Sequence, residues 1–370
     1  MFEPWTFARS GLTASNRLVV AAMTNKQSNP DGSLHARELR WLTRRAAGGF
    51  GMVATCAAHV RLDGQGWPGE LGVYDDVLMP GLRELAGGLS SHGALGVVQL
   101  FHGGLRAPSD LTGQQPISAA AFTPAREGAE SSRPATEDEI LAIIASFAAA
   151  AARCEAAGFQ GVELHGAHGY LLSQFLGQTL NTRTDDWGGP SLENRARLLM
   201  TTLRAVRERV SAGFLVGVRI SPELTDIGVE LDDSLQVAAW LAEGGADFVH
   251  VSLWDAWKRT KRYPDDPTPL TTRFRQALPD ACPLMIAGGI WSRAQAEAVC
   301  EQGADFIALA RAAIAHPDWP RAARADPNYA PAHPPFTPEA LEAAALSPRF
   351  VDYMRRWPGF VTDGRPPRAV

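Results

Sequence analysis

A glycine-led joint, Gly158-Phe159-Gln160-Gly161-Val162, separates a long amphipathic stretch from a short apolar run and indicates how this chain folds. Before the joint, Thr136 and Glu139 have the spacing of a capping box, and apolar residues then repeat at helical intervals. A glycine at the end of a helix readily takes the left-handed conformation that closes the last turn. The sequence therefore predicts a helix over 137–157 that ends in a left-handed glycine cap and passes directly into a buried strand.

The same joint recurs at three other places in the chain, at Gly48-Gly49-Phe50, Gly244-Gly245-Ala246 and Gly303-Ala304-Asp305. Short apolar runs predict eight buried strands, at 17–22, 50–54, 97–101, 161–165, 215–220, 247–251, 284–287 and 305–309. Amphipathic stretches predict helices at 35–47, 79–92, 137–157, 192–210, 232–243, 266–278 and 293–302. Eight strands alternating with helices favour a single (β/α)8 TIM barrel. A doubly wound sheet is the alternative, but no strand is followed by G-x-G-x-x-G.

We expect the barrel to occupy residues 1–320. The polar, proline-containing stretch at about 103–135 is too long for a plain connection and predicts a lid after the third strand. Residues 321–370 belong to no strand–helix unit and predict a C-terminal extension.

Composition excludes several classes of protein. The chain has 370 residues and a formal net charge of −5, and this acidic balance disfavours binding to nucleic acid. We find no continuous apolar run of the ~18 or more residues typical of a membrane span, and no secretory signal. The four cysteines are scattered with no C-x-x-C pair, which argues against a zinc or iron–sulfur site. We expect a cytoplasmic enzyme without a metal.

Hydrogen-bond donors cluster after the fourth predicted strand, where His165, His168 and Tyr170 fall within six residues. In a barrel the carboxyl ends of the strands carry the active site. Two imidazoles can polarise a carbonyl oxygen, and a phenol can supply a proton. A zinc site is a weaker option, because no cysteine or further histidine lies nearby in the sequence.

Polar side chains also interrupt other predicted strands. Arg219 lies in an apolar strand, where a guanidinium needs either an anionic ligand or an internal partner such as Glu163. Gln99 lies in the third strand, and Thr24 follows the first. These positions predict polar groups at the barrel mouth.

A phosphate site is predicted after the last two strands. Gly288 and Gly289 permit close approach of the backbone, and Arg311 at the neighbouring strand offers a bidentate partner. The loops after strands seven and eight form the usual phosphate site of such barrels.

These residues belong to a longer recognisable pattern. The stretch 165–176, which begins His165-Gly166-Ala167-His168-Gly169-Tyr170, together with 181–189 and Glu193-Asn194-Arg195, resembles the signature of the Old Yellow Enzyme family of FMN-dependent ene-reductases. The resemblance covers roughly residues 5 to 320.

The resemblance implies a tightly but non-covalently bound FMN and NAD(P)H as the diffusible hydride donor. It places the flavin across the barrel mouth, with Arg219 and Gln99 at the N1/O2 edge and Thr24 at the O4/N5 edge. The residues assigned to the cofactor are Ala22, Met23, Thr24, Cys56, Ala57, Gln99, Arg219, Gly288, Gly289, Ala310 and Arg311.

The resemblance also implies the chemistry at the substrate. His165 and His168 would bind the carbonyl or nitro oxygen of an electron-poor alkene, and Tyr170 would protonate its α-carbon after hydride reaches the β-carbon. Lys26 is counted with the substrate-binding residues because short-chain bacterial members often have a tyrosine near this position. A homodimer is compatible with the resemblance.

Three other functions remain open on the sequence alone. A flavin oxidoreductase could use a nitroester, a quinone or oxygen as acceptor. A cofactor-free barrel lyase could act on a phosphorylated substrate, with His165 and Tyr170 as acid and base. A non-catalytic flavin-binding protein is disfavoured by the intact set of His165, His168 and Tyr170.

The C-terminal extension carries a short amphipathic stretch after Ser347-Pro348, with Phe350, Tyr353, Arg355, Arg356 and Trp357. In some bacterial members of the family a C-terminal arginine reaches the active site of the neighbouring subunit. Packing of this stretch across the bottom of the barrel is the alternative.

Overall fold

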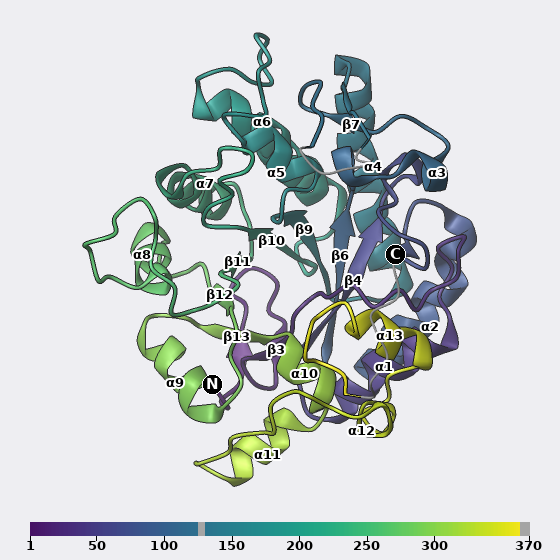
Figure 1. The fold of residues 1–370 in the computed structure, drawn as a ribbon, viewed down its shortest axis with the longest axis vertical. Coiled ribbons are helices and arrows are strands. Elements are labelled where there is room, and N and C mark those ends of the chain that lie inside the picture. The colour runs from purple at the N-terminus through teal and green to yellow at the C-terminus, as the bar shows by residue number, and fades with distance from the viewer. Residues whose placement is uncertain (125–129, 363–370) are drawn as a thin grey trace.

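The computed structural model describes residues 1–124 and 130–362, which form a closed barrel of parallel strands (Figure 1). The barrel strands are β3 (Leu18–Val20), β4 (Met52–His59), β6 (Leu95–Phe101), β9 (Gly161–Gly166), β10 (Leu215–Ile220), β11 (Phe248–Ser252), β12 (Leu284–Ala287) and β13 (Phe306–Leu309). They pair in the order β3-β13-β12-β11-β10-β9-β6-β4, and a further pairing of β3 with β4 closes the sheet. The predicted (β/α)8 barrel is confirmed.

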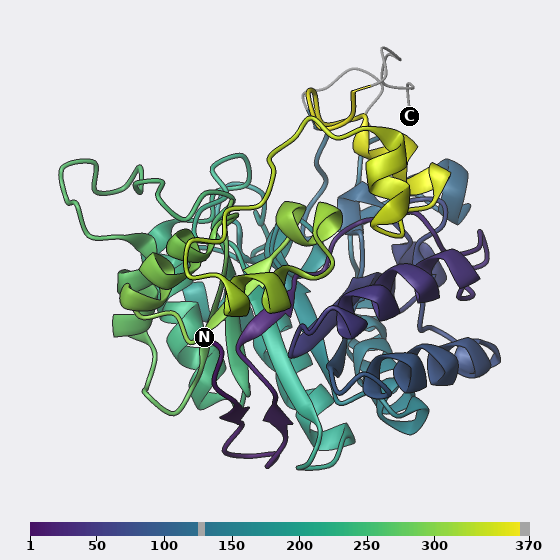
Figure 2. The same cartoon turned by 90° about the horizontal axis from the view of Figure 1, so that it is seen from below.

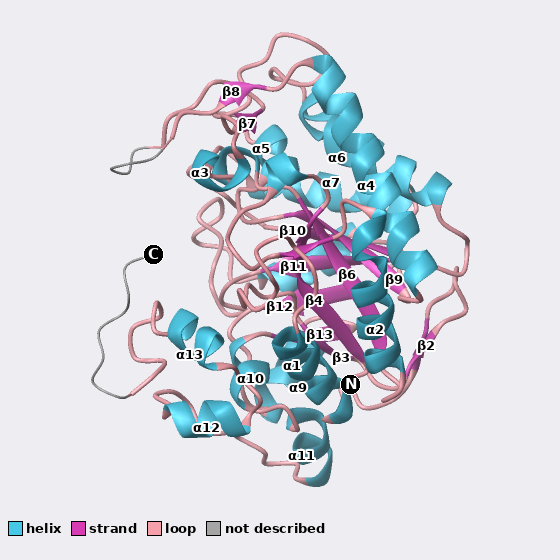
Figure 3. Ribbon diagram, turned by 90° about the vertical axis from the view of Figure 1, so that its right-hand side faces the viewer, coloured by secondary structure: helices cyan, strands magenta, loops and turns pink. Residues whose placement is uncertain are grey.

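Helices follow the strands and form an outer layer around the sheet (Figure 3). In chain order they are α1 (Ala36–Ala47), α2 (Met79–Ser90), α4 (Glu137–Ala157), α6 (Leu192–Arg209), α7 (Leu231–Glu243), α8 (Leu270–Ala277), α9 (Arg293–Glu301) and α10 (Arg311–Ala315). Short elements in the connections are η1 (Leu62–Gly64), β5 (Leu71–Gly72), η2 (Asp76–Leu78) and α5 (Leu171–Leu176).

The predicted glycine joints have the expected backbone. Thr136 and Glu139 form a full capping box at the start of α4, which runs over the predicted residues. Gly158 closes the helix with φ of 94°, and Gly49, Gly245 and Gly303 also have positive φ. This left-handed conformation turns the chain from the outer layer into the next buried strand.

Two predicted elements have limits that differ by four or more residues at one end, whereas the others differ by at most two residues at either end. Strand β4 continues to His59 rather than ending at residue 54, because an irregularity between Ala54 and Ala57 shifts its register against β6 without ending the pairing. Helix α8 begins at Leu270 rather than at residue 266. Pro267 and Pro269 explain the later start, since a proline disfavours the helical conformation in the residue before it.

The amino ends of the strands are closed by the N-terminal hairpin of β1 (Trp5–Thr6) and β2 (Thr13–Ala14). Phe7 beside it stacks on Phe306, with ring centroids 5.5 Å apart, and lies 6.3 Å from Phe248. Gly217 leaves the space for the Phe248 ring, because a Cβ at that position would lie 2.1 Å from ring carbons. Aromatic packing therefore fills this end, and an internal ligand has room only at the other end.

Beyond α10 the chain forms α11 (Trp319–Ala325), α12 (Pro338–Ala343) and α13 (Pro348–Met354). In Figure 2 the yellow part of this segment, which contains α13, lies at the end of the molecule opposite the purple N-terminal hairpin. Phe350 of α13 packs edge-on against Trp41 of α1, with ring centroids 5.3 Å apart. The amphipathic stretch after Ser347-Pro348 therefore does not pack across the bottom of the barrel, which was one of the two expectations for it.

The stretch predicted as a lid contains η3 (Gly104–Arg106), α3 (Ser109–Thr112), β7 (Ile117–Ser118) and β8 (Arg133–Pro134). Residues 125–129 of this stretch lie outside the described residues. Gln174 of α5 holds the stretch through hydrogen bonds to Ser118 Oγ at 3.0 Å and to the Leu105 N–H at 3.2 Å.

One helix of the described chain, α4, is long and apolar enough by length and composition to cross a membrane. Half of its most apolar window is buried inside the protein, as expected of a helix that packs on a barrel. By itself this helix is weak evidence for a membrane span.

Candidate active site

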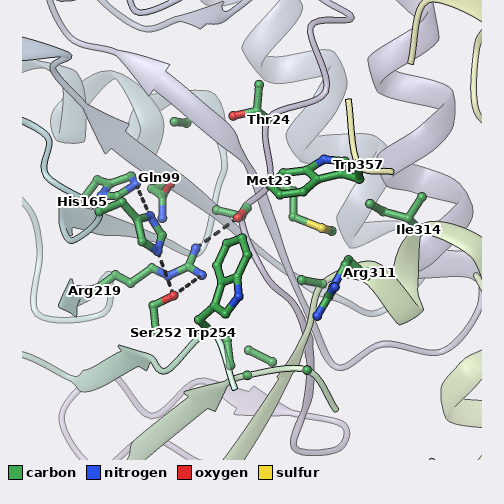
Figure 4. A pocket seen from close by; sticks show the side chains of 18 of the residues that line it. Met23, Thr24, Gln99, His165, Arg219, Ser252, Trp254, Arg311, Ile314 and Trp357 are labelled. Carbon is green, nitrogen blue, oxygen red and sulfur yellow. Dashed lines mark hydrogen bonds between the residues drawn. The ribbon is translucent and has the colours of Figure 1, made fainter. Parts of the chain in front are cut away.

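All eight barrel strands contribute to one pocket at their carboxyl ends (Figure 4). The residues that line it from the strands, or directly after them, are Ala22, Met23, Thr24, Ala57, Gln99, His165, Arg219, Ser252, Ala287 and Ala308. Loops after the strands add Trp67, His168, Tyr170, Trp254, Gly288, Gly289, Ile290, Trp291, Ala310 and Arg311. The predicted polar groups, separated by up to about 290 residues in sequence, therefore meet at one site.

A buried polar layer forms the floor of the pocket. Glu163 accepts a hydrogen bond from Gln99 Nε2 at 2.6 Å and pairs with His250 Nδ1 at 2.7 Å. Burial alone raises the pKa of this carboxyl, but His250, Arg219 and Gln99 outweigh burial and lower the pKa. Glu163 is therefore an anion beneath the pocket, and its direct hydrogen bonds go to Gln99 and His250 rather than to Arg219.

Arg219 lies above this layer with 5% of its surface exposed. Its Nη1 donates to the Ala22 carbonyl at 3.0 Å and its Nη2 to Ser252 Oγ at 3.2 Å (Figure 4). Its Nε is buried and has no hydrogen-bond partner among the described residues. A buried, unpaired guanidinium donor is costly, so this site is suited to an acceptor supplied by a ligand.

The two imidazoles are held in a chain of hydrogen bonds. His165 Nδ1 accepts from the Ala167 N–H at 3.3 Å, which places the proton of the neutral ring on Nε2. This Nε2 faces His168 Nδ1 at 3.3 Å, and His168 Nε2 faces Ser252 Oγ at 2.8 Å. An oxygen of a ligand that binds both rings would replace the contact between them.

His168 is positioned by an unusual backbone. Its φ is 61°, a conformation that non-glycine residues rarely adopt, and its N–H donates to Ser221 Oγ at 3.1 Å. This turn after β9 brings His168 back over His165, with ring centroids 5.0 Å apart.

Both histidines are neutral at ordinary pH. Burial and the positive charge of Arg219 lower the pKa of His165 to about 3 and hold the pKa of His168 well below its usual value. They can therefore donate hydrogen bonds as neutral imidazoles but do not supply a positive charge.

Tyr170 precedes α5 and faces the same space. Its ring packs edge-on against Phe101 at 4.6 Å and against His165 at 5.0 Å between centroids. The Arg106 guanidinium lies 5.2 Å from the ring centroid. Burial raises the pKa of the phenol, although Arg106 opposes the shift, so the hydroxyl keeps its proton at neutral pH.

The end of the pocket beside β12 and β13 is suited to binding an anion. Gly289 has φ of 63°, and a Cβ at Gly288 would lie 2.7 Å from the Ala256 nitrogen, so both positions require glycine. Arg311 is exposed at the start of α10 and makes no side-chain hydrogen bond or ion pair within the described part of the chain. Backbone N–H groups and a guanidinium at this edge are the partners that a phosphate group needs.

Two residues predicted for the site lie outside the pocket. Beyond the irregularity in β4, Ala57 faces the pocket and Cys56 faces the outer layer, where its thiol contacts Glu38 Oε1 at 2.8 Å. The Cys56 thiol therefore does not face the pocket, and a contact of this residue with the cofactor stays a prediction. Lys26 does not line the pocket either, and its Nζ lies over the ring of Tyr353 at 5.6 Å.

Several residues that form the mouth of the pocket were not predicted for the site from the sequence. Tyr353 and Trp357 of the C-terminal extension line the pocket of their own chain, and Tyr353 is hydrogen-bonded to Thr24. Trp254, after β11, lies 5.8 Å from Trp357 between ring centroids. The aromatic pattern of the extension was visible in the sequence, but nothing in it indicated which end of the barrel it covers.

A flat polar ring with a phosphate tail matches this pocket. Gln99 and the unpaired Nε of Arg219 offer donors at the floor, and the Gly288-Gly289 turn with Arg311 can hold the phosphate. In residues 1–124 and 130–362 no group of three or more His, Cys, Asp or Glu could hold a metal ion. The barrel and its pocket define the class of flavin-dependent oxidoreductases.

Comparison with known proteins identifies the family. The model of the NADH:flavin oxidoreductase / NADH oxidase family matches residues 1–328. The probable NADH-dependent flavin oxidoreductase YqiG of Bacillus subtilis is 36% identical over 323 residues, or 86% of each chain. An NADPH dehydrogenase of Bacillus licheniformis is 31% identical over 328 residues, or 87% of this chain and 93% of its own.

Solved structures agree with this result. The old yellow enzyme homologue from Zymomonas mobilis superposes with a TM-score of 0.79 at 26% identity, covering 92% of this chain and 95% of that one. The chain belongs to the NADH:flavin oxidoreductase family of Old Yellow Enzyme type. It is an NAD(P)H-dependent flavin oxidoreductase whose cofactor is FMN.

Proposed function

We propose that this protein is an ene-reductase, which uses NAD(P)H to reduce electron-poor alkenes such as enones, enals, maleimides and nitroalkenes. The observation that carries the proposal is the position of a protonated phenol, Tyr170, 5.0 Å between ring centroids from His165 in the same pocket. A proton donor beside a pair of oxygen-binding imidazoles suits the addition of hydrogen across a polarised double bond.

FMN would be held by the residues that face its two ends. Arg219 and Gln99 would bind the polar edge of the ring, and Arg311 with the Gly288-Gly289 turn would bind the phosphate. When bound, FMN supplies the capacity to accept hydride from NAD(P)H and to deliver it to the alkene. The positive charge of Arg219 would stabilise negative charge on the flavin ring.

His165 and His168 would bind the substrate oxygen as two neutral donors. Their hydrogen bonds withdraw electrons from the alkene and prepare its β-carbon to accept hydride. His165 Nε2 is already a donor, whereas His168 must move its proton to Nδ1, and Ser252 Oγ can then donate to His168 Nε2. Ser252 is a positioning residue in this scheme.

Tyr170 would transfer its phenolic proton to the α-carbon as the carbanion forms there. Its raised pKa keeps the proton available at neutral pH, and solvent returns the proton after turnover. Acceptors such as quinones, nitroesters or oxygen do not require protonation at carbon, so the placement of Tyr170 favours the alkene.

Product analysis tests the proposal. The purified holoenzyme is incubated anaerobically with cyclohexenone, N-phenylmaleimide or a nitrostyrene and a regenerated supply of NADPH or NADH. Chromatography with mass detection should show the saturated products, and a reaction in D₂O should place one deuterium at the α-carbon. Turnover of quinone or oxygen without any alkene reduction would refute the proposal.

A further inference from the structure

The loop between β11 and α8, residues 253–269, lies beside the mouth of the pocket and projects from the barrel (Figure 1). Trp254, the second residue of the loop, lines the pocket and is 66% exposed with φ of 64°. The N–H of Ala256 donates to the Gly288 carbonyl at 3.0 Å, so the loop is joined to the glycine turn. Together with Trp357, whose ring centroid lies 5.8 Å away, Trp254 places exposed aromatic surface at the pocket mouth, where a ligand can cover it.

The middle of this loop is firmly anchored. Thr260 is 4% exposed and donates to Glu223 Oε1 at 2.7 Å. Arg262 pairs with Asp232 at 3.4 Å, and the Tyr263 hydroxyl donates to the same carboxylate at 2.8 Å. Glu223 and Asp232, the carboxylates that contact this part of the loop, are therefore already bonded to Thr260, Arg262 and Tyr263.

Three cations of the loop remain without such partners. Lys258, Arg259 and Lys261 have no side-chain hydrogen bond or ion pair within residues 1–124 and 130–362. They flank the anchored Thr260 and follow closely after Trp254 and the exposed Trp257. The loop also contains Asp255, Asp265 and Asp266, and Asp266 pairs with Arg273. The three cations therefore outnumber by one the loop carboxylates that have no ion pair among the described residues, in a chain whose formal net charge is −5.

We propose that this loop binds the phosphorylated adenosine end of a nucleotide whose other end enters the pocket, and that it makes the enzyme prefer NADPH to NADH. Lysine and arginine bind phosphate groups, and indole rings stack on a base. The nicotinamide must enter the pocket to reach the flavin, so the rest of the dinucleotide must leave across the rim. The 2′-phosphate, which NADH lacks, is the group that three free cations would distinguish.

Coenzyme A is a second ligand that the loop could bind in this way, because its adenosine carries a 3′-phosphate. A thioester substrate would place that phosphate at the rim in the same way. We favour the nicotinamide because NAD(P)H is the reductant of this enzyme, and the experiment separates the two.

The test measures only the reduction of the bound flavin, so it does not depend on the identity of the alkene. Lys258, Arg259 and Lys261 are changed together to glutamine. A control variant changes Arg83, Arg204 and Arg209, three exposed arginines of the outer helices, to glutamine, which removes the same charge elsewhere. Anaerobic stopped-flow absorbance at increasing NADPH or NADH gives Kd and the limiting rate for each protein.

We expect wild type to bind NADPH about tenfold or more tightly than NADH, since one charge-assisted hydrogen bond to a phosphate typically strengthens binding by a factor of this order. The loop variant should lose this preference, with the limiting rate within about threefold and Kd for NADH little changed. Binding of NADPH to wild type should also weaken as salt is raised, because exposed charges are screened. The control variant should keep the preference.

Equal affinity of wild type for NADPH and NADH, or equal weakening of NADPH binding in the loop and control variants, would overturn the proposal. Inhibition by coenzyme A that disappears in the loop variant, with NADPH binding unaltered, would overturn the assignment to the hydride donor and give the phosphate site to a thioester substrate instead.

Discussion

Replacing Tyr170 by phenylalanine should slow only one half of the catalytic cycle. The substitution removes one hydroxyl and keeps the ring that packs against Phe101 at 4.6 Å, His165 at 5.0 Å and Trp67 at 6.4 Å. The pocket should therefore keep its shape and its FMN. Reduction of the flavin by NAD(P)H requires no proton from the phenol, so its rate should stay within a few-fold of wild type.

Reduction of an enone should slow much more. General acid catalysis by a positioned group typically contributes ~10²–10⁴-fold, or about 3–5 kcal/mol of barrier. Burial raises the pKa of Tyr170, so the wild-type phenol is fully protonated at pH 7, and the full effect of the substitution should appear there. Nitroalkenes should be affected less, because the nitronate formed from them is stable without immediate protonation.

Stopped-flow absorbance of the flavin measures the two halves separately, with NADPH in one experiment and cyclohexenone in the other. Tyr353→Phe is the matched control, since it removes the other phenol of the pocket, which is hydrogen-bonded to Thr24 instead of facing His165. Equal slowing of both halves in Tyr170→Phe would mean that the residue positions ligands and does not donate a proton. No slowing of either half would remove it from the mechanism.

Four further outcomes are expected. Arg311→Ala should purify partly colourless and bind added FMN about 10- to 100-fold more weakly by fluorescence titration, because the substitution removes a charge-assisted hydrogen bond to the phosphate, whereas Arg83→Ala should bind normally. Replacing both His165 and His168 by alanine should abolish the long-wavelength absorbance that phenols give over a bound flavin, with FMN retained. Since the pKa of His165 is lowered to about 3, wild-type affinity for a phenol should rise with pH only up to the phenol's own pKa, with no step near pH 6.5. Trp357→Ala should raise KM for alkenes several-fold with little change in Tm, because this residue is 39% exposed and lines the pocket mouth; an unchanged KM would exclude it from substrate binding.

Local signals in the sequence were sufficient to predict the barrel. The capping box of Thr136 and Glu139 and the left-handed Gly158 depend only on neighbouring residues, and both have the expected geometry. Apolar runs identified all eight strands, four of them directly after a glycine joint, because strands buried on both faces consist mainly of apolar residues. Since the carboxyl ends of barrel strands converge, the sequence also predicted that Gln99, His165 and Arg219 would meet.

The tertiary structure determined the directions of side chains and the contacts between residues that lie far apart in the sequence. Cys56 and Ala57 are neighbours in sequence, yet an irregularity in β4 sends the thiol to Glu38 and the methyl group to the pocket. The sequence could not show that Arg219 keeps one donor unpaired, because Glu163 is bonded to two other side chains. Nor could it place Trp357 beside Trp254, because about 100 residues separate them and contacts of the C-terminal helix with α1 and with Gln27 fix where that segment lies. Periodicity and capping act over one turn or one strand, whereas side-chain direction and long-range contacts are set by the closed barrel as a whole.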